Sequence, residues 1–273
     1  MTRQPTSDSI FSRILNRGFH RYVRRFVRRN FNAVRIAGHC HVEHIPAGPV
    51  ICFINHPGWW DPMTAVLLTG HFLPGHQFAA PMDADALKSY PILERLGFFP
   101  VAKDSGTGTK EFLRTSRELL RSPETALWIT PTGKFHDVRQ AEKFLHGLGH
   151  IADRDFSGTL LSAAIEYTFW SERFPELLVE FSEPVDCRDL PADRDDRTRI
   201  LENVLAKTQE SLARRAIARD AAAFMTLSEG RSGIGGFYDF WRRLTAWALG
   251  NSFRSRHAAE QSPSAGVSTG GVK

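Results

Sequence analysis

The amino-acid sequence predicts an α/β protein, and three observations indicate it. Short β-like apolar runs alternate along the chain with helical stretches, and turn residues lie at the joints between them. A basic segment near the N-terminus carries apolar residues at helical spacing. The 273 residues, 42% of them hydrophobic and 24% charged, are enough to bury one large core.

The first predicted element is a basic amphipathic helix. Seven arginines lie between Arg13 and Arg29, in a chain whose formal net charge is +5. Apolar residues recur among them at spacings of three and four: Ile10, Phe11, Ile14, Leu15, Phe19, Tyr22, Val23, Phe26 and Val27. Two interpretations remain open, namely that the arginines bind a membrane surface, or that the apolar stripe packs on the protein's own core. No nucleic-acid motif accompanies the charge, so no nucleic-acid partner is expected.

Six candidate strands follow, at residues 32–38, 49–55, 77–81, 125–130, 159–167 and 176–181. Candidate helices begin near Pro62, Ala84, Thr109 and Arg199, and the last runs roughly from Thr198 to Ala222. An aromatic stripe at helical spacing covers residues 237–248, and the Ser/Gly-rich end is expected to be disordered. We therefore expect a membrane-associating helix at 1–32, an α/β domain at 33–253 and a tail at 254–273.

Cysteine usage and hydropathy indicate the compartment. The three cysteines, Cys40, Cys52 and Cys187, are widely spaced, and the N-terminus shows no signal-peptide pattern. No run of about 18 apolar residues occurs, so no segment is expected to cross a bilayer. We expect a cytoplasmic protein that lies peripherally on the inner face of the cell membrane.

The stretch INHPGWWDP, residues 54–62, contains the main candidate for chemistry. It follows the strand VICFI and precedes the helix that begins at Pro62, so Asp61 is expected to cap that helix. Capping leaves His56 unexplained. A carboxylate folded back towards the imidazole would fix one tautomer and raise the basicity of the other ring nitrogen. The pair His56 and Asp61 therefore predicts a general base.

This stretch resembles the His-x4-Asp motif of the glycerolipid acyltransferase family, whose enzymes acylate glycerol phosphate and lysophospholipids. Three further blocks follow in the family's order. In GFFPVAKD, residues 97–104, Gly97 is followed six positions later by the basic Lys103. TPTGKFHD, residues 130–137, resembles the third block, and FLHGLGHIA with LLSAAIEY resembles the last. The resemblance covers roughly residues 33–185 and implies a mixed, largely parallel sheet flanked by helices, with His56 and Asp61 as the catalytic pair.

The third block departs from the family's pattern, usually Phe-Pro-Glu-Gly-Thr-Arg. Thr132 stands at the glutamate position, Lys134 at the threonine position and Phe135 at the arginine position. In the family this block helps to bind the acceptor's glycerol phosphate. The resemblance assigns acceptor or phosphate binding to Lys103, Pro131, Thr132, Gly133 and Lys134. The alternative, that the acceptor carries no phosphate at this place, stays open.

Acyl transfer from a thioester to a hydroxyl requires a base, an oxyanion site and an apolar slot. His56 supplies the base, and no G-x-S-x-G elbow indicates a covalent intermediate, so direct attack is expected. No cofactor is expected, because acyl-CoA or an acyl carrier protein serves as co-substrate. Supporting roles are assigned to Asn55, Gly58, Trp59, Trp60 and Gly97. Backbone N–H groups near Gly58 or Gly133 are the candidate oxyanion donors, and the tryptophans either line the thioester, meet lipid or pack in the core.

Two rival functions remain as alternatives. GHCHVEH brings His39, Cys40, His41 and His44 close in sequence, and all four are metal-ligand types. On a strand, however, Cys40 would point away from His39 and His41, so no metal site is expected. The second rival is a non-catalytic membrane-surface protein that keeps an acyltransferase shell. The altered third block favours it, and the presence of both His56 and Asp61 opposes it.

Overall fold

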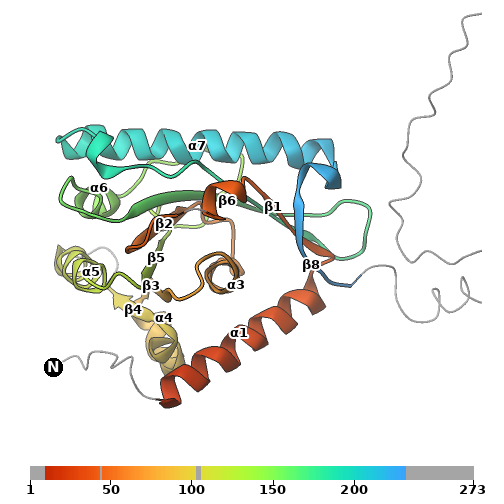
Figure 1. Cartoon of the computed structure of the whole chain (residues 1–273), viewed down its shortest axis with the longest axis horizontal. Coiled ribbons are helices and arrows are strands. Elements are labelled where there is room, and N and C mark those ends of the chain that lie inside the picture. Colours follow the sequence, from red (N-terminus) through yellow and green to blue (C-terminus); the bar gives the residue numbers. More distant parts are fainter. Residues whose placement is uncertain (1–9, 44, 103–105, 232–273) are drawn as a thin grey trace, which may run out of the picture.

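The computed structural model describes residues 10–43, 45–102 and 106–231, with side chains from residue 17 onward. These residues form one sheet with helices on both faces (Figure 1). Its strands are β1 (Ala33–Ala37), β2 (Val50–Ile54), β3 (Gln77–Asp83), β4 (Phe98–Val101), β5 (Thr125–Ile129), β6 (Thr159–Thr168), β7 (Glu176–Phe181) and β8 (Met225–Glu229). All six predicted strands are present, and β4 and β8 were not predicted.

The strand order is β4-β3-β5-β2-β6-β7-β1-β8. The pairs β6–β7 and β1–β8 are antiparallel, and the other neighbouring pairs of the described sheet are parallel. The expected mixed, largely parallel sheet is therefore confirmed. Because β5, β2 and β6 are parallel neighbours, their carboxyl ends lie along one edge, and the segments that follow them meet there.

The helices form a layer on each face of the sheet. They are α1 (Ile10–Asn30), α2 (Cys40–Glu43), α3 (Asp61–Phe72), α4 (Ala84–Ser89), α5 (Gly106–Leu119), α6 (Gly147–Ile151) and α7 (Arg194–Ala218), with 3-10 turns η1 (Pro91–Leu96), η2 (Cys187–Asp189) and η3 (Ala221–Ala223). In Figure 1, α1 and α3 cover one face and α7 covers the other. No helix in the described part of the chain is both long and apolar enough to cross a membrane.

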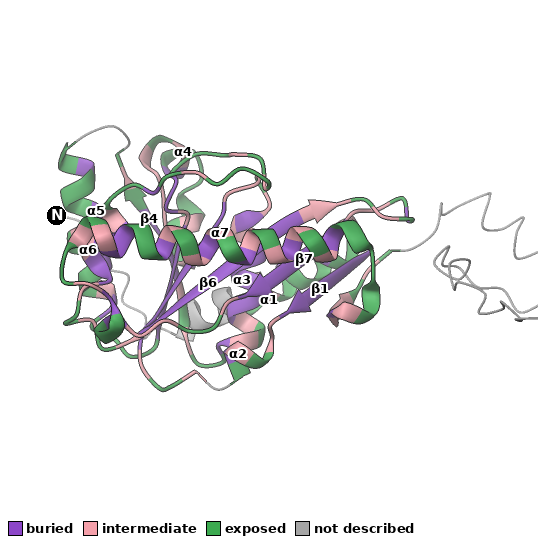
Figure 2. Cartoon of the chain, turned by 90° about the horizontal axis from the view of Figure 1, so that it is seen from above, coloured by how far each residue is buried: buried purple, intermediate pink, exposed green. Residues whose placement is uncertain are grey.

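The sheet lies between two apolar cores. In β2, Cys52 and Ile54 join the core beneath α1 and α3, while Ile51 and Phe53 join the core beneath α5, α6 and α7. Successive strand residues point to opposite faces, so a strand covered on both sides must be apolar throughout. This explains the unbroken run VICFI, and Figure 2 shows the central strands buried along their length.

The apolar stripe of α1 packs on the protein itself. Val23 and Val27 are 0% and 2% exposed, and both belong to the core beneath α3. Gly70 of α3 permits the close approach, because a β-carbon there would lie 2.6 Å from Nδ1 of His20. The described arginines of α1 are exposed. The packing interpretation of this helix is therefore confirmed, and the membrane interpretation now concerns its arginines alone.

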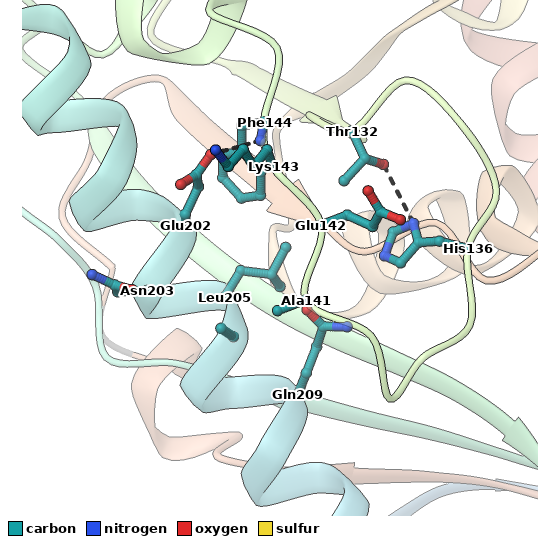
Figure 3. Close-up of a pocket in the computed structure, with 11 residues that line it drawn as sticks. Thr132, His136, Ala141, Glu142, Lys143, Phe144, Glu202, Asn203, Leu205 and Gln209 are labelled. Carbon is teal, nitrogen blue, oxygen red and sulfur yellow. Dashed lines mark hydrogen bonds between the residues drawn. The ribbon is translucent and has the colours of Figure 1, made fainter.

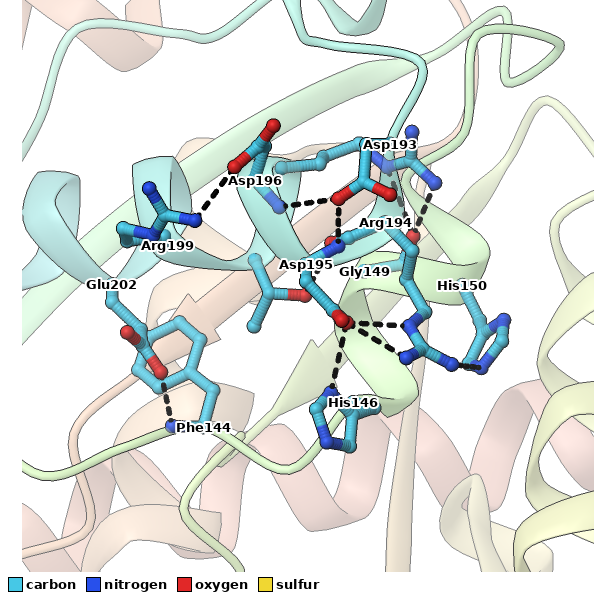
Figure 4. Close-up of polar contacts among 12 residues, drawn as sticks. Phe144, His146, Gly149, His150, Asp193, Arg194, Asp195, Asp196, Arg199 and Glu202 are labelled. Carbon is cyan, nitrogen blue, oxygen red and sulfur yellow. Dashed lines mark hydrogen bonds and ion pairs between the residues drawn. The ribbon is translucent and has the colours of Figure 1, made fainter.

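Helix α7 begins at Arg194, earlier than the predicted Thr198, because Asp193 caps it. The carboxylate of Asp193 accepts hydrogen bonds from the backbone N–H groups of Asp195 and Asp196, both at 2.9 Å. Arg197 then donates from Nε and Nη2 to the carbonyl of Gly149 on α6, at 2.9 and 2.8 Å. Figure 4 shows this junction, which joins the start of α7 to α6 and to the chain just before it.

Some predictions lie outside the described residues, among them the aromatic stripe at 237–248 and the tail at 254–273. The strand geometry considered for GHCHVEH is not found, because Cys40–Glu43 forms the helical turn α2. The positive φ of 63° at Gly38 ends β1 and turns the chain into this helix, and a β-carbon at Gly38 would lie 2.3 Å from the carbonyl oxygen of Phe181.

Candidate active site

The corner after β2 is held to the neighbouring strand β6 by Asn55. Its side-chain Nδ2 donates to the carbonyl of Ile165 at 2.9 Å, and its Oδ1 accepts from the N–H of Ile165 at 2.7 Å. These two bonds extend the pairing of the two parallel strands beyond Ile54, the last residue of β2. The buried side-chain amide of Asn55 therefore fixes the position of the backbone from which His56 extends.

His56 and Asp61 lie in direct contact. Nδ1 of His56 is 2.5 Å from Oδ2 of Asp61, which also accepts a hydrogen bond from the N–H of Gly58 at 3.1 Å. The side chain of Asp61 is 2% exposed and that of His56 is 20% exposed. An ionised carboxylate only accepts hydrogen bonds, so Nδ1 carries the proton and Nε2 of a neutral ring keeps its lone pair.

The predicted helix cap at Asp61 is wrong. Residue Trp60 occupies the N-cap position of α3, and no side chain caps the helix there. The oxygens of Asp61 instead accept from His56, Gly58 and Tyr167. A carboxylate that turns back across the loop towards β6 is not aimed at the first N–H groups of its own helix.

Tyr167 is a site residue that the sequence analysis missed. Its hydroxyl donates to Oδ1 of Asp61 at 2.7 Å and accepts from Thr64 Oγ1 at 3.0 Å. Burial, and then the charge of Asp61, raise the pKa of Tyr167 well above its usual value, so the hydroxyl stays a neutral donor. The only signal in the sequence was its place at the end of LLSAAIEY, in a strand expected beside VICFI.

The third-block loop lies beside this corner because β5 and β2 are parallel neighbours. Gly133, at φ 65°, turns the chain and donates its N–H to the carbonyl of Thr130 at 3.0 Å. The N–H of Leu145 donates to the carbonyl of Pro131 at 2.8 Å, and that of His136 donates to the carbonyl of His56 at 3.2 Å. The loop is therefore anchored to the residue that carries the imidazole.

Lys134 and Arg139 of this loop are paired with carboxylates. Lys134 Nζ lies 3.0 Å from Glu142, and Arg139 lies 3.6 Å from Asp137 and 3.5 Å from Glu166. Burial raises the pKa of Glu166, and Arg139 partly offsets this rise. Lys103, the remaining basic residue assigned to the acceptor, lies outside the described residues.

Aromatic rings border the exposed side of His56. The ring of Phe135, at the family's arginine position, lies 4.2 Å from the imidazole centroid, and Trp59 lies 6.0 Å from Phe135. Trp59 is 83% exposed. Trp60 instead packs inward, 5.1 Å from Phe26 of α1. The two adjacent tryptophans therefore have different environments, one at the surface and one against the core.

The two candidate oxyanion donors are already engaged. The N–H of Gly58 donates to Asp61, and that of Gly133 donates to Thr130. Gly97 has a structural role between η1 and β4: its φ is 101°, and a β-carbon there would lie 2.1 Å from the carbonyl oxygen of Phe78. This glycine is required by the backbone turn rather than by contact with His56.

A small cavity lies between the third-block loop and α7 (Figure 3), with a volume of about 140 Å³. It is lined by Thr132, His136, Ala141, Glu142, Lys143, Phe144, Glu202, Asn203, Leu205, Ala206 and Gln209. Charged and polar side chains line it together with the apolar side chains of Phe144 and Leu205. Thr132 Oγ1 faces it and lies 3.5 Å from Nδ1 of His136.

The structure brings no metal-ligand cluster together within the described residues. Cys40 and His41 lie on the turn α2, and His44 lies outside the part of the chain that is described. Because Cys40–Glu43 is helical, its side chains do not alternate between two faces as they would on a strand.

The fold and the corner together define a class: an α/β protein with a histidine and a buried carboxylate at the carboxyl end of a central strand. Residues 37–165 match the model of the family described as Acyltransferase. The crystal structure of the 1-acyl-sn-glycerophosphate (LPA) acyltransferase PlsC from Thermotoga maritima is similar, with a TM-score of 0.52 and 14% identity, over 74% of this chain and 81% of that chain. No curated protein matches the sequence. The resemblance to acyltransferases is thus confirmed, and the likeness to PlsC is one of fold.

Proposed function

We propose that the protein transfers a fatty acyl group from a thioester, acyl-CoA or acyl carrier protein, to a hydroxyl of a lysophospholipid or glycerol-phosphate-like acceptor. The observation that carries the proposal is the 2.5 Å contact between His56 and the buried carboxylate of Asp61. The family match over residues 37–165 and the PlsC-like fold support it. No cofactor enters the scheme.

In this proposal His56 is the general base. Its Nε2 takes the proton of the acceptor hydroxyl as the oxygen attacks the thioester carbonyl. The tetrahedral intermediate then collapses, the C–S bond breaks and the leaving thiolate takes the proton from His56. Asp61 stabilises the imidazolium that forms between these steps. The acyl group passes directly from the thioester to the acceptor oxygen, so no covalent intermediate with the protein is required.

The surroundings of His56 support a lipid substrate. Trp59, Phe135 and Leu145 are large apolar side chains that stay exposed around the corner. Leu145 lies next to the turn at Gly133, where a β-carbon would be 2.8 Å from Cδ1 of the leucine. Exposed apolar groups gathered at a reactive residue favour a substrate or surface that is itself apolar.

The acceptor's phosphate is proposed to contact Lys103 and the third block, Pro131 to Lys134. Lys134 already has an ion pair with Glu142, so phosphate binding there requires that pair to open. The pair is largely exposed on the lysine side, and such pairs are weak. Lys103→Ala is therefore expected to raise KM for a phosphorylated acceptor more than for a neutral one. Equal effects on both acceptors would instead favour an acceptor without phosphate at this place.

The main experiment measures thiol release from acyl-CoA and from an acyl carrier protein, with lysophosphatidic acid and with a neutral lyso-lipid as acceptors. His56→Ala serves as the matched inactive protein. Acceptor-dependent thiol release above that of His56→Ala supports the proposal. Release no greater than that of the variant, with both donors and both acceptors, would favour a non-catalytic membrane-surface protein.

We also propose that residues 33–253 form the acyltransferase domain and that the protein acts peripherally on the inner face of the cell membrane. The exposed arginines of α1 support the second point, because basic residues near anionic lipids each contribute about 1 kcal/mol. Since the apolar stripe of α1 is buried in the fold, attachment through this helix is electrostatic and should weaken as salt is raised.

A further inference from the structure

A second concave surface lies at the C-terminal end of α1, and no residue of the His56 corner lines it. It is an open hollow of about 700 Å³. Its lining consists of four arginines, three aromatic residues and an asparagine: Arg25, Arg29, Arg173, Arg231, Tyr22, Phe26, Phe174 and Asn30. No acidic side chain takes part in this lining.

The hollow is built from three segments that are far apart in the sequence. The end of α1 supplies one wall, the connection between β6 and β7 supplies the second, and Arg231, two residues after β8, supplies the third. Backbone hydrogen bonds join these walls: Asn32 donates to Pro175 at 2.8 Å, and Arg231 donates to Phe31 at 3.1 Å. Figure 1 shows α1 ending beside β8, where these contacts are made.

The charge of the hollow is concentrated and only partly balanced. Arg25, Arg29 and Arg231 have no ion pair with a carboxylate among the residues that the structure describes. Like charges in one hollow repel each other, and an anion that lies between them removes this repulsion.

Aromatic rings orient two of the guanidinium groups. The guanidinium carbons of Arg173 and Arg231 lie 5.3 and 5.8 Å from the ring centroid of Phe174. The N–H groups at the edge of a guanidinium match two oxygens of a phosphate, and a ring against its face, as at Arg231, leaves that edge uncovered. A phosphate group carries enough oxygens for several such contacts at once.

We propose that this hollow binds a phosphate group of a phosphorylated ligand, at a site distinct from the His56 corner. The headgroup of an anionic membrane lipid and a soluble phosphate ester share this chemistry. The site differs from a general attraction of α1 to anionic membranes, because Arg173 and Arg231 lie outside that helix. The inference does not depend on the proposed acyl transfer.

The test uses the full chain and two probes. Calorimetry measures the binding of inorganic phosphate, and sedimentation measures binding to phosphatidylcholine vesicles with and without phosphatidylglycerol. Two variants change the site: Arg25→Gln with Arg29→Gln, and Arg231→Gln alone. Two controls remove the same charge elsewhere: Arg21→Gln with Arg28→Gln on the exposed side of α1, and Arg121→Gln in the turn after α5. Circular dichroism and thermal unfolding verify that each variant is folded.

We expect each site arginine that is removed to weaken binding by about fivefold, and each control to weaken it less. Loss of phosphate binding would identify a site that accepts a soluble ester, whereas loss confined to phosphatidylglycerol vesicles would identify a lipid headgroup. Both outcomes support the site. Equal losses in the site variants and their controls would overturn it in favour of diffuse attraction, and unchanged binding in Arg231→Gln would overturn it as well.

Discussion

At the scale of single residues, Asp61 is the most constrained side chain of the candidate site. Its two oxygens accept hydrogen bonds from His56, Gly58 and Tyr167, and the group is buried. Three donors that converge on one carboxylate determine its orientation. The imidazole of His56 is thereby held with Nδ1 towards the carboxylate and Nε2 towards the exposed side.

Replacement of the proposed base tests the chemistry most directly. We expect His56→Ala to lower kcat by roughly a hundredfold or more, the usual contribution of general acid–base catalysis. Stability should change little, since the side chain is partly exposed and contributes little to the core. Steady-state thiol release measures kcat, and His146→Ala, at a largely exposed histidine, is the control. Near-normal turnover in His56→Ala would contradict the assignment.

Asp61→Asn separates orientation from charge. The amide has one acceptor oxygen in place of two, and its NH₂ group facing His56 would favour the wrong imidazole tautomer. We expect kcat to fall roughly a hundredfold or more. The free energy of unfolding should also fall by about 1–3 kcal/mol, because a buried donor loses its partner. Urea denaturation measures this loss.

The matched control for Asp61→Asn is Tyr167→Phe, which removes one donor to Asp61 and leaves the contact with His56 intact. Turnover in this control should fall less than in Asp61→Asn. If Asp61→Asn keeps wild-type turnover while only its stability falls, the carboxylate has a structural role and the proposed mechanism fails.

At the scale of elements, α1 has the two faces of an amphipathic helix. Its buried stripe includes Val23 and Val27 and completes the core over α3, whereas its arginines remain exposed. Deletion of the helix would therefore uncover the core. A loss of membrane binding after such a deletion could result either from the missing arginines or from unfolding. Charge substitutions that leave the stripe intact are the appropriate test of the arginines.

The packing role of α1 has its own test. Val23→Ala removes two buried methyl groups, so we expect the free energy of unfolding to fall by about 1.5–3 kcal/mol, including the cost of the cavity. Urea denaturation gives this value. Arg21→Ala, at an exposed position of the same helix, should stay within about 0.5 kcal/mol of the wild type. A Val23→Ala protein as stable as the wild type would show that α1 does not need this contact.

At the scale of the whole molecule, the parallel order β5-β2-β6 assembles the candidate site. It aligns the carboxyl ends of three strands, and there His56 after β2, the third-block loop after β5 and Tyr167 near the end of β6 come together. The same fold buries two of the three cysteines: Cys52 lies in one core and Cys187 in the other, while Cys40 is exposed.

Thiol reactivity reports on the integrity of the whole fold. Burial raises the pKa of Cys187 to about 12 and raises that of Cys52 too, so neither forms an appreciable thiolate near neutral pH. At pH 8 we expect a thiol reagent to modify one cysteine per native chain, Cys40, and all three after unfolding in urea. Cys40→Ser should abolish the rapid reaction. Rapid modification of two or three thiols in the native protein would show that a core opens.

The sequence by itself determined the class of fold, six of the strands, the basic N-terminal helix and the four later predicted helices, because periodicity and turn chemistry are local properties. Strand β4 has only four residues and lies within GFFPVAKD, the block in which only the glycine and the lysine were interpreted. Strand β8 lies at an edge of the sheet, and its sequence contains few apolar residues. The local prediction also failed at Asp61. An aspartate followed by a proline is typical of a capped helix start, but the carboxylate of Asp61 does not cap α3 and accepts hydrogen bonds from other groups instead.

Only the tertiary structure decided the partners of the site. Tyr167 lies 106 residues after Asp61, and its contact depends on β6 lying beside β2, which no local pattern specifies. The aromatic cover of His56 by Phe135 and the arginine hollow beside β8 have the same origin. Spacing along the chain predicts which residues share one element, whereas contacts between elements follow from strand order and packing, which depend on the chain as a whole.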